Sequence, residues 1–169
     1  IDLLHVRPVI LQQESGFYLK SEAKSCFGDC IDVDPRESSW ARELSVDLQI
    51  ALGTCHNVSL LTDGSQVGNN VEVSMLQTSG WTLSGPNRDR SLTPPAWLAN
   101  VGAVDVLRIF EFDHVRMTSG VVVRERRSKV IRIYIKGSYE RIASLSCEIS
   151  VPADFENVTE QYASNSYYV

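Results

Sequence analysis

The four cysteines are the residues of this 169-residue chain whose chemistry is easiest to interpret. An even number of cysteines suits disulfide bonds, which occur mainly in proteins exposed to an oxidising environment. Three residues separate Cys26 from Cys30, a spacing that fits a local loop closure, while Cys55 and Cys147 lie far apart in the chain. We therefore predict the bridges Cys26–Cys30 and Cys55–Cys147. Free thiols in a cytosolic protein are the alternative.

The histidines and the acidic residues do not form a recognisable metal site. His5, His56 and His114 are scattered along the chain, whereas a structural zinc site needs paired ligands at short spacings. The acidic stretch 29–37 lacks the glycine that a calcium-binding EF-hand requires, so it indicates a solvated loop. We predict that the protein holds no metal ion and no cofactor.

No catalytic constellation is recognisable from the spacing of reactive residues. In the stretch Gly-Ser-Gln-Val-Gly at 64–68 the serine comes one position too early for the Gly-x-Ser-x-Gly turn of a nucleophile elbow. No other spacing pairs a nucleophile with a base, or two carboxylates with each other. We therefore predict that the chain is not an enzyme and that it has no catalytic residue.

Composition and charge argue against two classes of protein. A net charge of −5 and a pI near 5.2 argue against binding of nucleic acid, because phosphate contacts need a basic surface. The basic cluster Arg124-Glu-Arg-Arg127 is interrupted by Glu125, and it indicates a solvated hairpin. No run of about 18 apolar residues occurs, so we expect no membrane-spanning segment in this chain.

Two further signals indicate an extracellular protein. Asn57-Val-Ser and Asn157-Val-Thr match the acceptor pattern for N-glycosylation. Together with the even number of cysteines, they predict a secreted glycoprotein that is modified at Asn57 and Asn157. The first residues, Ile-Asp-Leu-Leu-His-Val-Arg-Pro, lack the layout of a signal peptide, as expected of a mature or trimmed N-terminus.

Alternating apolar residues predict the strands that must position these groups. The alternation is clearest in residues 44–50, 70–76 and 131–135, and each pattern is typical of a strand with one buried face. The residues predicted to be buried are Leu44, Val46, Leu48, Ile50, Val71, Val73, Ile131, Ile133 and Ile135. Those predicted to face solvent are Asp47, Gln49, Glu72 and Arg132.

Several short strands separated by Gly, Pro and Asn turns predict an all-β fold, an Ig-like β-sandwich. The length is that of a single domain over residues 1–169. Residues 1–40 form an N-terminal segment with the local disulfide loop, and residues 41–169 form the sandwich core. A short N-terminal helix and an edge strand are both compatible with residues 1–20.

The order of several segments resembles the extracellular ligand-binding domain of pentameric Cys-loop receptors and the acetylcholine-binding proteins. The similarity covers residues 44–169. The segments that carry it are Val46-Asp-Leu-Gln-Ile, Val71 to Trp81, Ser91 to Trp97, Ser119-Gly-Val-Val-Val, Tyr134-Ile-Lys-Gly-Ser-Tyr139, and Glu148-Ile-Ser-Val with Tyr162-Ala-Ser. The resemblance implies a β-sandwich subunit that assembles into a homo-oligomeric ring, a pentamer, with ligand sites between neighbouring subunits.

The resemblance also implies a ligand site for a small cation. Trp81 and Tyr139 occupy positions that contribute aromatic rings to the ligand box, and such rings attract quaternary ammonium ions. The chain departs from the family at Val104, where an aromatic residue is expected, and it lacks the two cysteines of the signature loop. The implied function is therefore a ring-forming, secreted binding protein with an incomplete or altered site. The alternative is an adhesion or recognition ectodomain of a cell-surface or viral glycoprotein.

Overall fold

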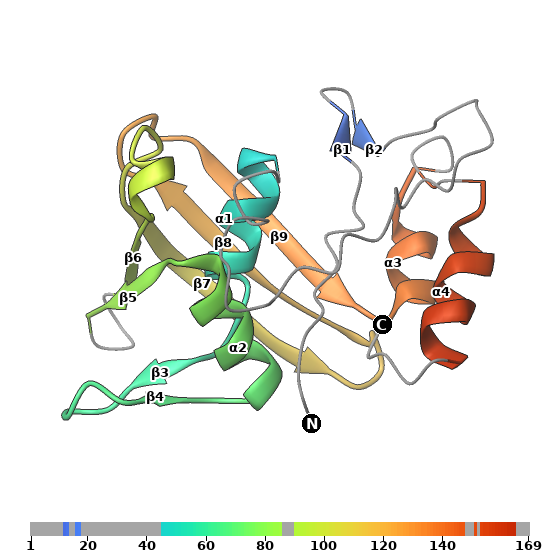
Figure 1. The fold of residues 1–169 in the computed structure, drawn as a ribbon, viewed down its shortest axis with the longest axis horizontal. Helices are drawn as coiled ribbons and strands as arrows, with labels where there is room; N and C mark the ends of the chain where they lie inside the picture. Colours follow the sequence, from blue (N-terminus) through green and yellow to red (C-terminus); the bar gives the residue numbers. More distant parts are fainter. Residues whose placement is uncertain are drawn as a thin grey trace.

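The computed structural model describes residues 12–13, 16–17, 45–85, 90–147, 151 and 153–164. Its main feature is a five-stranded antiparallel sheet in the order β5-β6-β7-β8-β9 (Figure 1). The long strands are β7 (Val104–Asp113), β8 (Thr118–Glu125) and β9 (Ile131–Gly137). The short strands β5 (Thr82–Ser84) and β6 (Ser91–Thr93) extend the sheet on the β7 side.

The remaining short elements stand outside this sheet. Strands β1 (Gln12–Gln13) and β2 (Gly16–Phe17) pair with each other, and so do β3 (Ser59–Leu60) and β4 (Gln66–Val67). A 3₁₀ turn, η2 (Ala96–Leu98), lies in the connection from β6 to β7. Strands β3 and β4 lie in the connection from α1 to α2, and none of these pieces belongs to the five-stranded sheet.

Two helices begin at residues whose side chains cap them. The helix α1 (Val46–Thr54) follows Ser45, whose hydroxyl accepts a hydrogen bond from the Leu48 N–H at 3.3 Å. The helix α2 (Asn70–Ser79) follows Asn69, whose side chain accepts from the Val71 N–H at 2.9 Å. Such caps satisfy backbone donors that have no partner inside the helix. Gly80 ends α2 in the left-handed conformation, which glycine adopts without strain.

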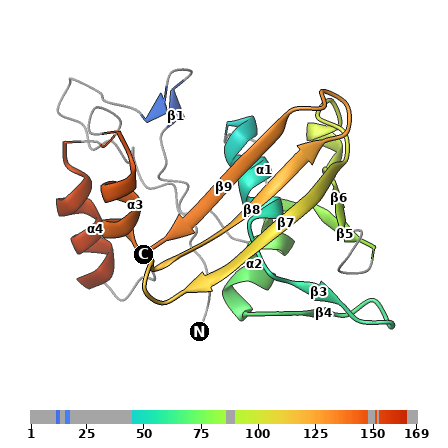
Figure 2. The same ribbon diagram turned by 180° about the vertical axis from the view of Figure 1, so that it is seen from behind.

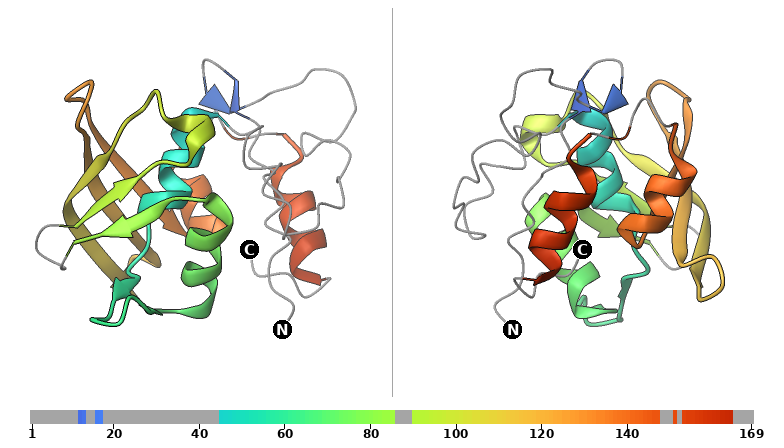
Figure 3. Two further views of the ribbon diagram at one scale, coloured as in Figure 1. Left: turned by 60° about the vertical axis from the view of Figure 1, so that its left-hand side comes forward. Right: turned by 90° about the vertical axis from the view of Figure 1, so that its right-hand side faces the viewer.

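Both helices lie on the same side of the sheet, so its two faces differ. We call the face that α1 and α2 cover the inner face, and the opposite one the outer face. Figure 2 views the molecule from the outer face, with β7, β8 and β9 in front of the two helices. The edge-on view in Figure 3 separates the strands from α1 and α2 as two layers. No element in the described ranges covers the outer face of the three long strands.

The helices α3 (Tyr139–Leu145) and α4 (Phe155–Ser164) follow β9 and lie beside its C-terminal end (Figure 1). Ser138 caps α3 by accepting a hydrogen bond from the Arg141 N–H at 3.4 Å. The Tyr139 and Phe155 rings connect the two helices, with centroids 6.4 Å apart. No helix in the described part of the chain has both the length and the apolar composition needed to cross a bilayer.

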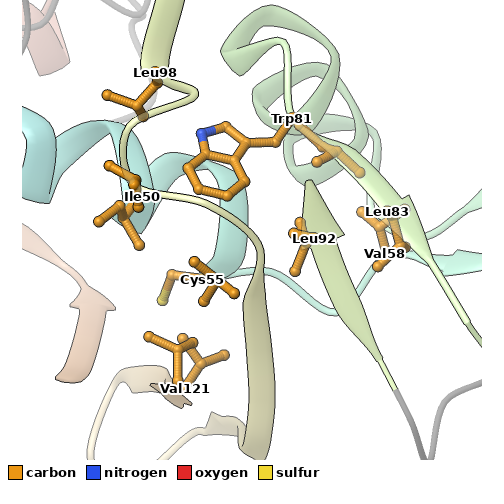
Figure 4. Close-up of a cluster of buried hydrophobic side chains, with 12 residues drawn as sticks. Ile50, Cys55, Val58, Trp81, Leu83, Leu92, Leu98 and Val121 are labelled. Carbon is orange, nitrogen blue, oxygen red and sulfur yellow. The ribbon is translucent and has the colours of Figure 1, made fainter. Parts of the chain in front are cut away.

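The hydrophobic core lies between the inner face and the two helices (Figure 4). Its members come from α1, α2, β5, β6, the inner face of β7 and β8, the turn η2 and the connections next to these elements. They are Ile50, Cys55, Val58, Leu76, Trp81, Leu83, Leu92, Leu98, Val101, Val104, Val121 and Val123. The Trp81 ring lies directly on Gly53 of α1, where an added Cβ would come within 2.4 Å of the ring. Only glycine allows the helix and the ring to approach this closely.

The predicted fold class is confirmed at the level of a mostly β protein. In the described part of the chain the strands form antiparallel sheets accompanied by four short helices, an arrangement compatible with a β-sandwich. The strand predicted at 131–135 is correct, because these residues lie in β9. The predicted N-terminal segment 1–40 falls almost wholly outside the described residues.

The strands predicted at 44–50 and 70–76 are wrong, because both stretches form helices. Caps at Ser45 and Asn69 and the glycine at 80 favour helices more strongly than four or five alternating residues favour strands. Gln49, predicted to face solvent, is buried, and its Oε1 accepts a hydrogen bond from Trp97 Nε1 at 3.1 Å. Val46, predicted to be buried, is 43% exposed.

In β9 the strand is correct, but its predicted orientation is wrong. Ile131, Ile133 and Ile135 are 60%, 64% and 55% exposed on the outer face. Arg132 and Tyr134 point to the inner face, where α1 lies, and both are partly buried. The alternation identified the two faces of the strand, but the helices cover the face opposite to the isoleucines. Leu44, also predicted to be buried, lies outside the described residues.

Candidate functional site

An ion pair joins β9 to α2 at one end of the inner face. Lys136 Nζ donates to Glu72 Oε1 at 2.5 Å, and the backbone N–H of Asn57 donates to Glu72 Oε2 at 3.0 Å. Partial burial raises the pKa of Glu72, but these two hydrogen bonds outweigh it and hold the pKa below its usual value. Both oxygens of an ionised Glu72 are therefore fixed.

The position of Glu72 follows from the start of α2. The Asn69 cap fixes the first turn of the helix, and Glu72 lies in that turn. A carboxylate there is favoured by the helix dipole, which places partial positive charge at the N-terminus. Glu72 was predicted to face solvent from a strand, whereas the helix turns it towards Lys136, where it is partly buried.

Phe112 of β7 lies in the same row of the sheet as Lys136. Thr118 of β8 pairs with Asp113 of β7 and with Gly137 of β9. Phe112 immediately precedes Asp113, and Lys136 immediately precedes Gly137. The two residues therefore lie on opposite sides of β8, in the row of the sheet next to that of Thr118. Two strand spacings, about 10 Å, separate their backbones.

Phe112 also shares the inner face with Lys136. Successive residues of a strand alternate between faces, and paired residues share one. Phe110 pairs with Gly120, while the pairing of Asp113 with Thr118 follows a register irregularity. This irregularity places Phe110 on the outer face and Phe112 on the inner face. The Phe112 ring is 49% exposed, and it meets the His114 ring edge to face at 5.0 Å.

We call Glu72, Phe112 and Lys136 the Lys136 site. It combines a cation, a fixed carboxylate and an accessible aromatic ring within one corner of the inner face. This set can hold a ligand that has both a flat ring and a negative charge, because the ring can stack on Phe112 while Lys136 neutralises the charge.

A buried pair, His56 and Arg90, lies behind the Lys136 site. The residues are 2% and 3% exposed. Arg90 Nη2 is 2.6 Å from His56 Nδ1 and 3.2 Å from the His56 carbonyl oxygen. Burial, and after it the nearby Arg90 charge, lower the pKa of His56 to about 4. His56 is therefore neutral at physiological pH.

Charge in this corner of the molecule is positive. Lys136 and Arg90 carry two positive charges, and Glu72 is the carboxylate that acts on both. Burial lowers the pKa of Arg90, although the guanidinium keeps its proton in proteins. Among the described residues no metal-binding group of His, Cys, Asp or Glu occurs. An anionic ligand suits this balance of charge better than a metal ion does.

Trp81 and Tyr139, the predicted ligand-binding residues, lie in different surroundings. Trp81 is 3% exposed in the core, where its ring packs on Gly53 (Figure 4). Tyr139 is partly exposed at the start of α3, and its ring contacts Phe155. Val104, where the box lacked an aromatic residue, is fully buried. A cation between Trp81 and Tyr139, and assembly of the chain with itself, stay predictions that no observation tests.

The predicted Cys55–Cys147 bridge is wrong, because Cys55 is a free thiol. The Cys55 Sγ is buried and lies 3.7 Å from the carbonyl oxygen of Tyr134. Burial raises the pKa of Cys55 to about 11, so the thiol is protonated and unreactive. Cys26 and Cys30 lie outside the described residues. Glycosylation at Asn57, which is exposed, and at Asn157 stays a prediction.

Only faint signals in the sequence point to the Lys136 site. Lys136 begins the stretch Lys-Gly-Ser, in which Gly137 ends β9 and Ser138 caps α3. Glu72 follows the cap residue Asn69 by three positions, a spacing typical of a first helical turn. Phe112 could not be placed, because the irregularity that turns it to the inner face has no sequence marker.

Comparison with known proteins finds relatives of one class, the cation-transporting ATPases. The chain is similar to human polyamine-transporting ATPase 13A2, with 31% identity over 135 residues, which are 70% of this chain and 11% of that protein. Mouse polyamine-transporting ATPase 13A2 is 32% identical over 139 residues, again 70% of this chain and 11% of the relative. Cation-transporting ATPase catp-5 of Caenorhabditis elegans is 23% identical over 155 residues, 80% of this chain and 13% of the relative.

The chain thus spans only 11% to 13% of the length of these curated relatives. No family model matches the chain. The similarity to human 13A2 nevertheless extends over 70% of this chain.

These relatives correct several predictions. The resemblance to acetylcholine-binding proteins and Cys-loop receptors is wrong, because the curated relatives are polyamine- and cation-transporting ATPases. The function that the resemblance implied, a secreted ring-forming binding protein, and the alternative of a recognition ectodomain are both contradicted by these relatives. The prediction that the chain is not an enzyme is also contradicted, because these relatives are cation-transporting ATPases, which are enzymes, although each matches this chain over only a small part of its own length. The alternation of short apolar segments is common to many β proteins, which explains the false resemblance.

The same comparison contradicts the prediction of a secreted protein. It rested on the even number of cysteines and on two acceptor asparagines, and the relatives are transporting ATPases. The free thiol of Cys55 removes the bridge that supported an oxidising environment. Patterns of two or three residues occur by chance, and they carry no information on the compartment unless the cysteines are paired.

Proposed function

We propose that this chain is part of a cation-transporting ATPase and that its Lys136 site binds the nucleotide. The observation that carries the proposal is the Lys136–Glu72 ion pair in the same sheet row as the accessible ring of Phe112. The similarity to human 13A2, whose name states that it is an ATPase, supports ATP as the nucleotide. For the whole protein we propose a cation as cargo, and polyamines are the cargo in the names of the 13A2 and 13A3 relatives.

The chemistry of the site matches the two parts of a nucleotide. A base stacks on an aromatic ring, an interaction of roughly 1–3 kcal/mol per base. Phosphate groups are bound by lysine as a compact point charge. The Lys136 side chain is 32% exposed, so a phosphate can reach the ammonium group without breaking its ion pair with Glu72. The second cation, Arg90, adds a positive potential from behind.

Binding of MgATP to the protein by isothermal titration calorimetry tests this proposal. Phe112→Ala and Lys136→Met should each weaken binding about tenfold or more, because they remove the stacking surface or the charge. Phe110→Ala is the matched control for the ring, since Phe110 is 44% exposed on the outer face of the same strand. Lys129→Met is the control for the charge, because Lys129 lies in the turn at the other end of β9.

Two results would contradict the proposal. The first is the absence of ATP binding at millimolar concentration by the folded native chain. The second is binding that Phe110→Ala weakens as strongly as Phe112→Ala does, which would place the nucleotide on the outer face or show a non-specific loss. Far-ultraviolet circular dichroism of each variant separates loss of binding from loss of structure.

A further inference from the structure

We infer that His56 and Arg90 are positioning residues for the Lys136 site. They hold the segment after α1 so that the Asn57 N–H fixes Glu72, which in turn holds Lys136. The inference rests on the proposed nucleotide function only for its effect on ATP affinity. The positioning itself can be measured without any nucleotide.

The hydrogen bonds of His56 require one tautomer. Nδ1 lies 3.1 Å from the backbone N–H of Val58 and 2.6 Å from Arg90 Nη2, and both of these groups can only donate. Nδ1 must therefore be unprotonated and accept both bonds. Nε2 lies 2.9 Å from the Gly53 carbonyl oxygen, which can only accept, so Nε2 carries the proton. Every polar atom of the ring is used.

These bonds fix the backbone before and after Asn57, the residue whose N–H binds Glu72. The His56 ring ties the chain back to Gly53 at the end of α1 and forward to Val58. Arg90 Nη2 donates hydrogen bonds to the His56 ring and to the His56 carbonyl oxygen. We call these hydrogen bonds of His56 with Gly53, Val58 and Arg90 the clamp. Asn57 lies between His56 and Val58, so the clamp sets the direction of the Asn57 N–H. That N–H is the donor to Glu72 Oε2.

Arg90 connects the clamp to another part of the chain. It precedes β6, 34 positions after His56, and it is buried without a carboxylate bonded to it among the described residues. A buried guanidinium is costly unless its donors are satisfied and its charge is balanced. His56 satisfies one terminal nitrogen, and the charge of Glu72 favours the cation.

The pKa of Glu72 is the nucleotide-independent measure of the clamp. The bond from the Asn57 N–H is one of the contacts that lower this pKa. Loosening the clamp should therefore raise it, because a misplaced N–H no longer stabilises the carboxylate. Carbon-13 NMR of the side-chain carboxyl groups, titrated with pH, measures the shift directly.

Two amide substitutions separate the roles of the ring atoms. In His56→Asn the amide oxygen takes the place of Nδ1, so it can accept from Val58 and Arg90. In His56→Gln the longer side chain places the amide near Nε2, and the acceptor at Nδ1 is lost. We expect an upward shift of the Glu72 pKa and about tenfold weaker ATP binding for His56→Gln. For His56→Asn we expect both quantities to stay near the native values.

Arg90→Lys gives a second, independent measurement. It keeps the positive charge, so the direct electrostatic effect on Glu72 remains, but it replaces Nη2, the one nitrogen that donates both to the His56 ring and to its carbonyl oxygen, with an ammonium group on a shorter and more flexible side chain. We expect the Glu72 pKa to shift upward, as in His56→Gln. Arg90→Lys also provides the measurement if circular dichroism shows that His56→Gln does not fold.

The outcomes distinguish the inference from the proposed function. A native chain that does not bind ATP, together with a raised Glu72 pKa in His56→Gln, would sink the nucleotide proposal and leave the positioning role standing. An unchanged Glu72 pKa in folded His56→Gln and Arg90→Lys would overturn the positioning role, even if Lys136→Met abolishes ATP binding. Equal shifts in His56→Asn and His56→Gln would also overturn it, because the acceptor at Nδ1 would then be irrelevant.

Discussion

The two faces of the β7–β8–β9 sheet carry similar apolar side chains in opposite surroundings. On the inner face Val121 and Val123 are 1% and 0% exposed beneath α1 and α2. On the outer face Ile131, Ile133 and Ile135 are more than half exposed. The difference is one of covering elements rather than of residue type. A strand pattern therefore identifies two faces without saying which of them the chain covers.

The charged residues of the sheet also differ between the inner and the outer face. The inner face contains the bond from Arg132 Nε to Glu125 Oε1 at 2.6 Å and the Lys136–Glu72 pair. On the outer face Arg108 lies over the Phe110 ring, 5.0 Å from its centroid. Long side chains such as arginine and lysine bury their stems and keep their charged ends paired or solvated. The polar residues of β9 can thus lie on the covered face while the isoleucines do not.

The largest expected effect comes from truncating an isoleucine on each side of this contrast. Ile50 is fully buried between α1 and the sheet, so Ile50→Ala should lower the free energy of unfolding by about 2–5 kcal/mol. Ile133→Ala makes the same chemical change on the outer face and should cost less than about 1 kcal/mol. Urea denaturation followed by circular dichroism measures both. Equal losses would show that the outer face is covered in solution.

A middle-sized effect is expected at Glu125, a buried carboxylate at the end of the inner face. Ser128 Oγ and Arg132 Nε donate to its two oxygens, each at 2.6 Å. Burial raises the pKa of Glu125, but these bonds outweigh it and hold the pKa below its usual value. Glu125→Gln should lower the free energy of unfolding at pH 7 by about 1–3 kcal/mol, because hydrogen bonds to a charged group are replaced by weaker ones.

The pH dependence gives this prediction its sign. The folded pKa of Glu125 lies below the unfolded one, so its contribution is complete above the unfolded value of about 4.3. The contribution is lost as the pH falls through the folded pKa. The difference between native and Glu125→Gln unfolding energies should therefore shrink on acidification below about pH 5. A difference that stays constant between pH 7 and pH 3 would show that charge at Glu125 does not matter.

Much of the sheet could be predicted from the sequence, but its covering layer could not. Strand β9 follows from the alternation of Ile131, Ile133 and Ile135, which a short strand displays whichever face is covered. The helices α1 and α2 contain equally clear alternation, and the capping residues Ser45 and Asn69 decided their structure. Local hydrogen bonds at helix ends therefore outweighed a weak periodic signal.

The Lys136 site was beyond sequence reasoning for a different reason. Glu72 and Lys136 are 64 positions apart, and they meet only because α2 packs on the inner face. Phe112 reaches that face through a register irregularity that depends on pairing with β8. Correct placement of α2 as a helix would have turned Glu72 towards the sheet. The partner on β9 would still have depended on knowing which face was covered.

The smallest expected effect is also the one that tests the outer face most directly. Ile133→Lys replaces a side chain that is 64% exposed, and it introduces a charge in the middle of the isoleucine row. If this face is open to solvent in the chain alone, the ammonium group stays hydrated and the free energy of unfolding changes by less than about 0.5 kcal/mol. Val121→Lys on the inner face is the matched comparison, and it should prevent folding because it buries an unpaired charge. Chemical denaturation measures the change in the free energy of unfolding for Ile133→Lys, and circular dichroism shows whether Val121→Lys folds. A loss of several kcal/mol in Ile133→Lys would place the isoleucines in a buried interface, and the two faces would then no longer differ in covering.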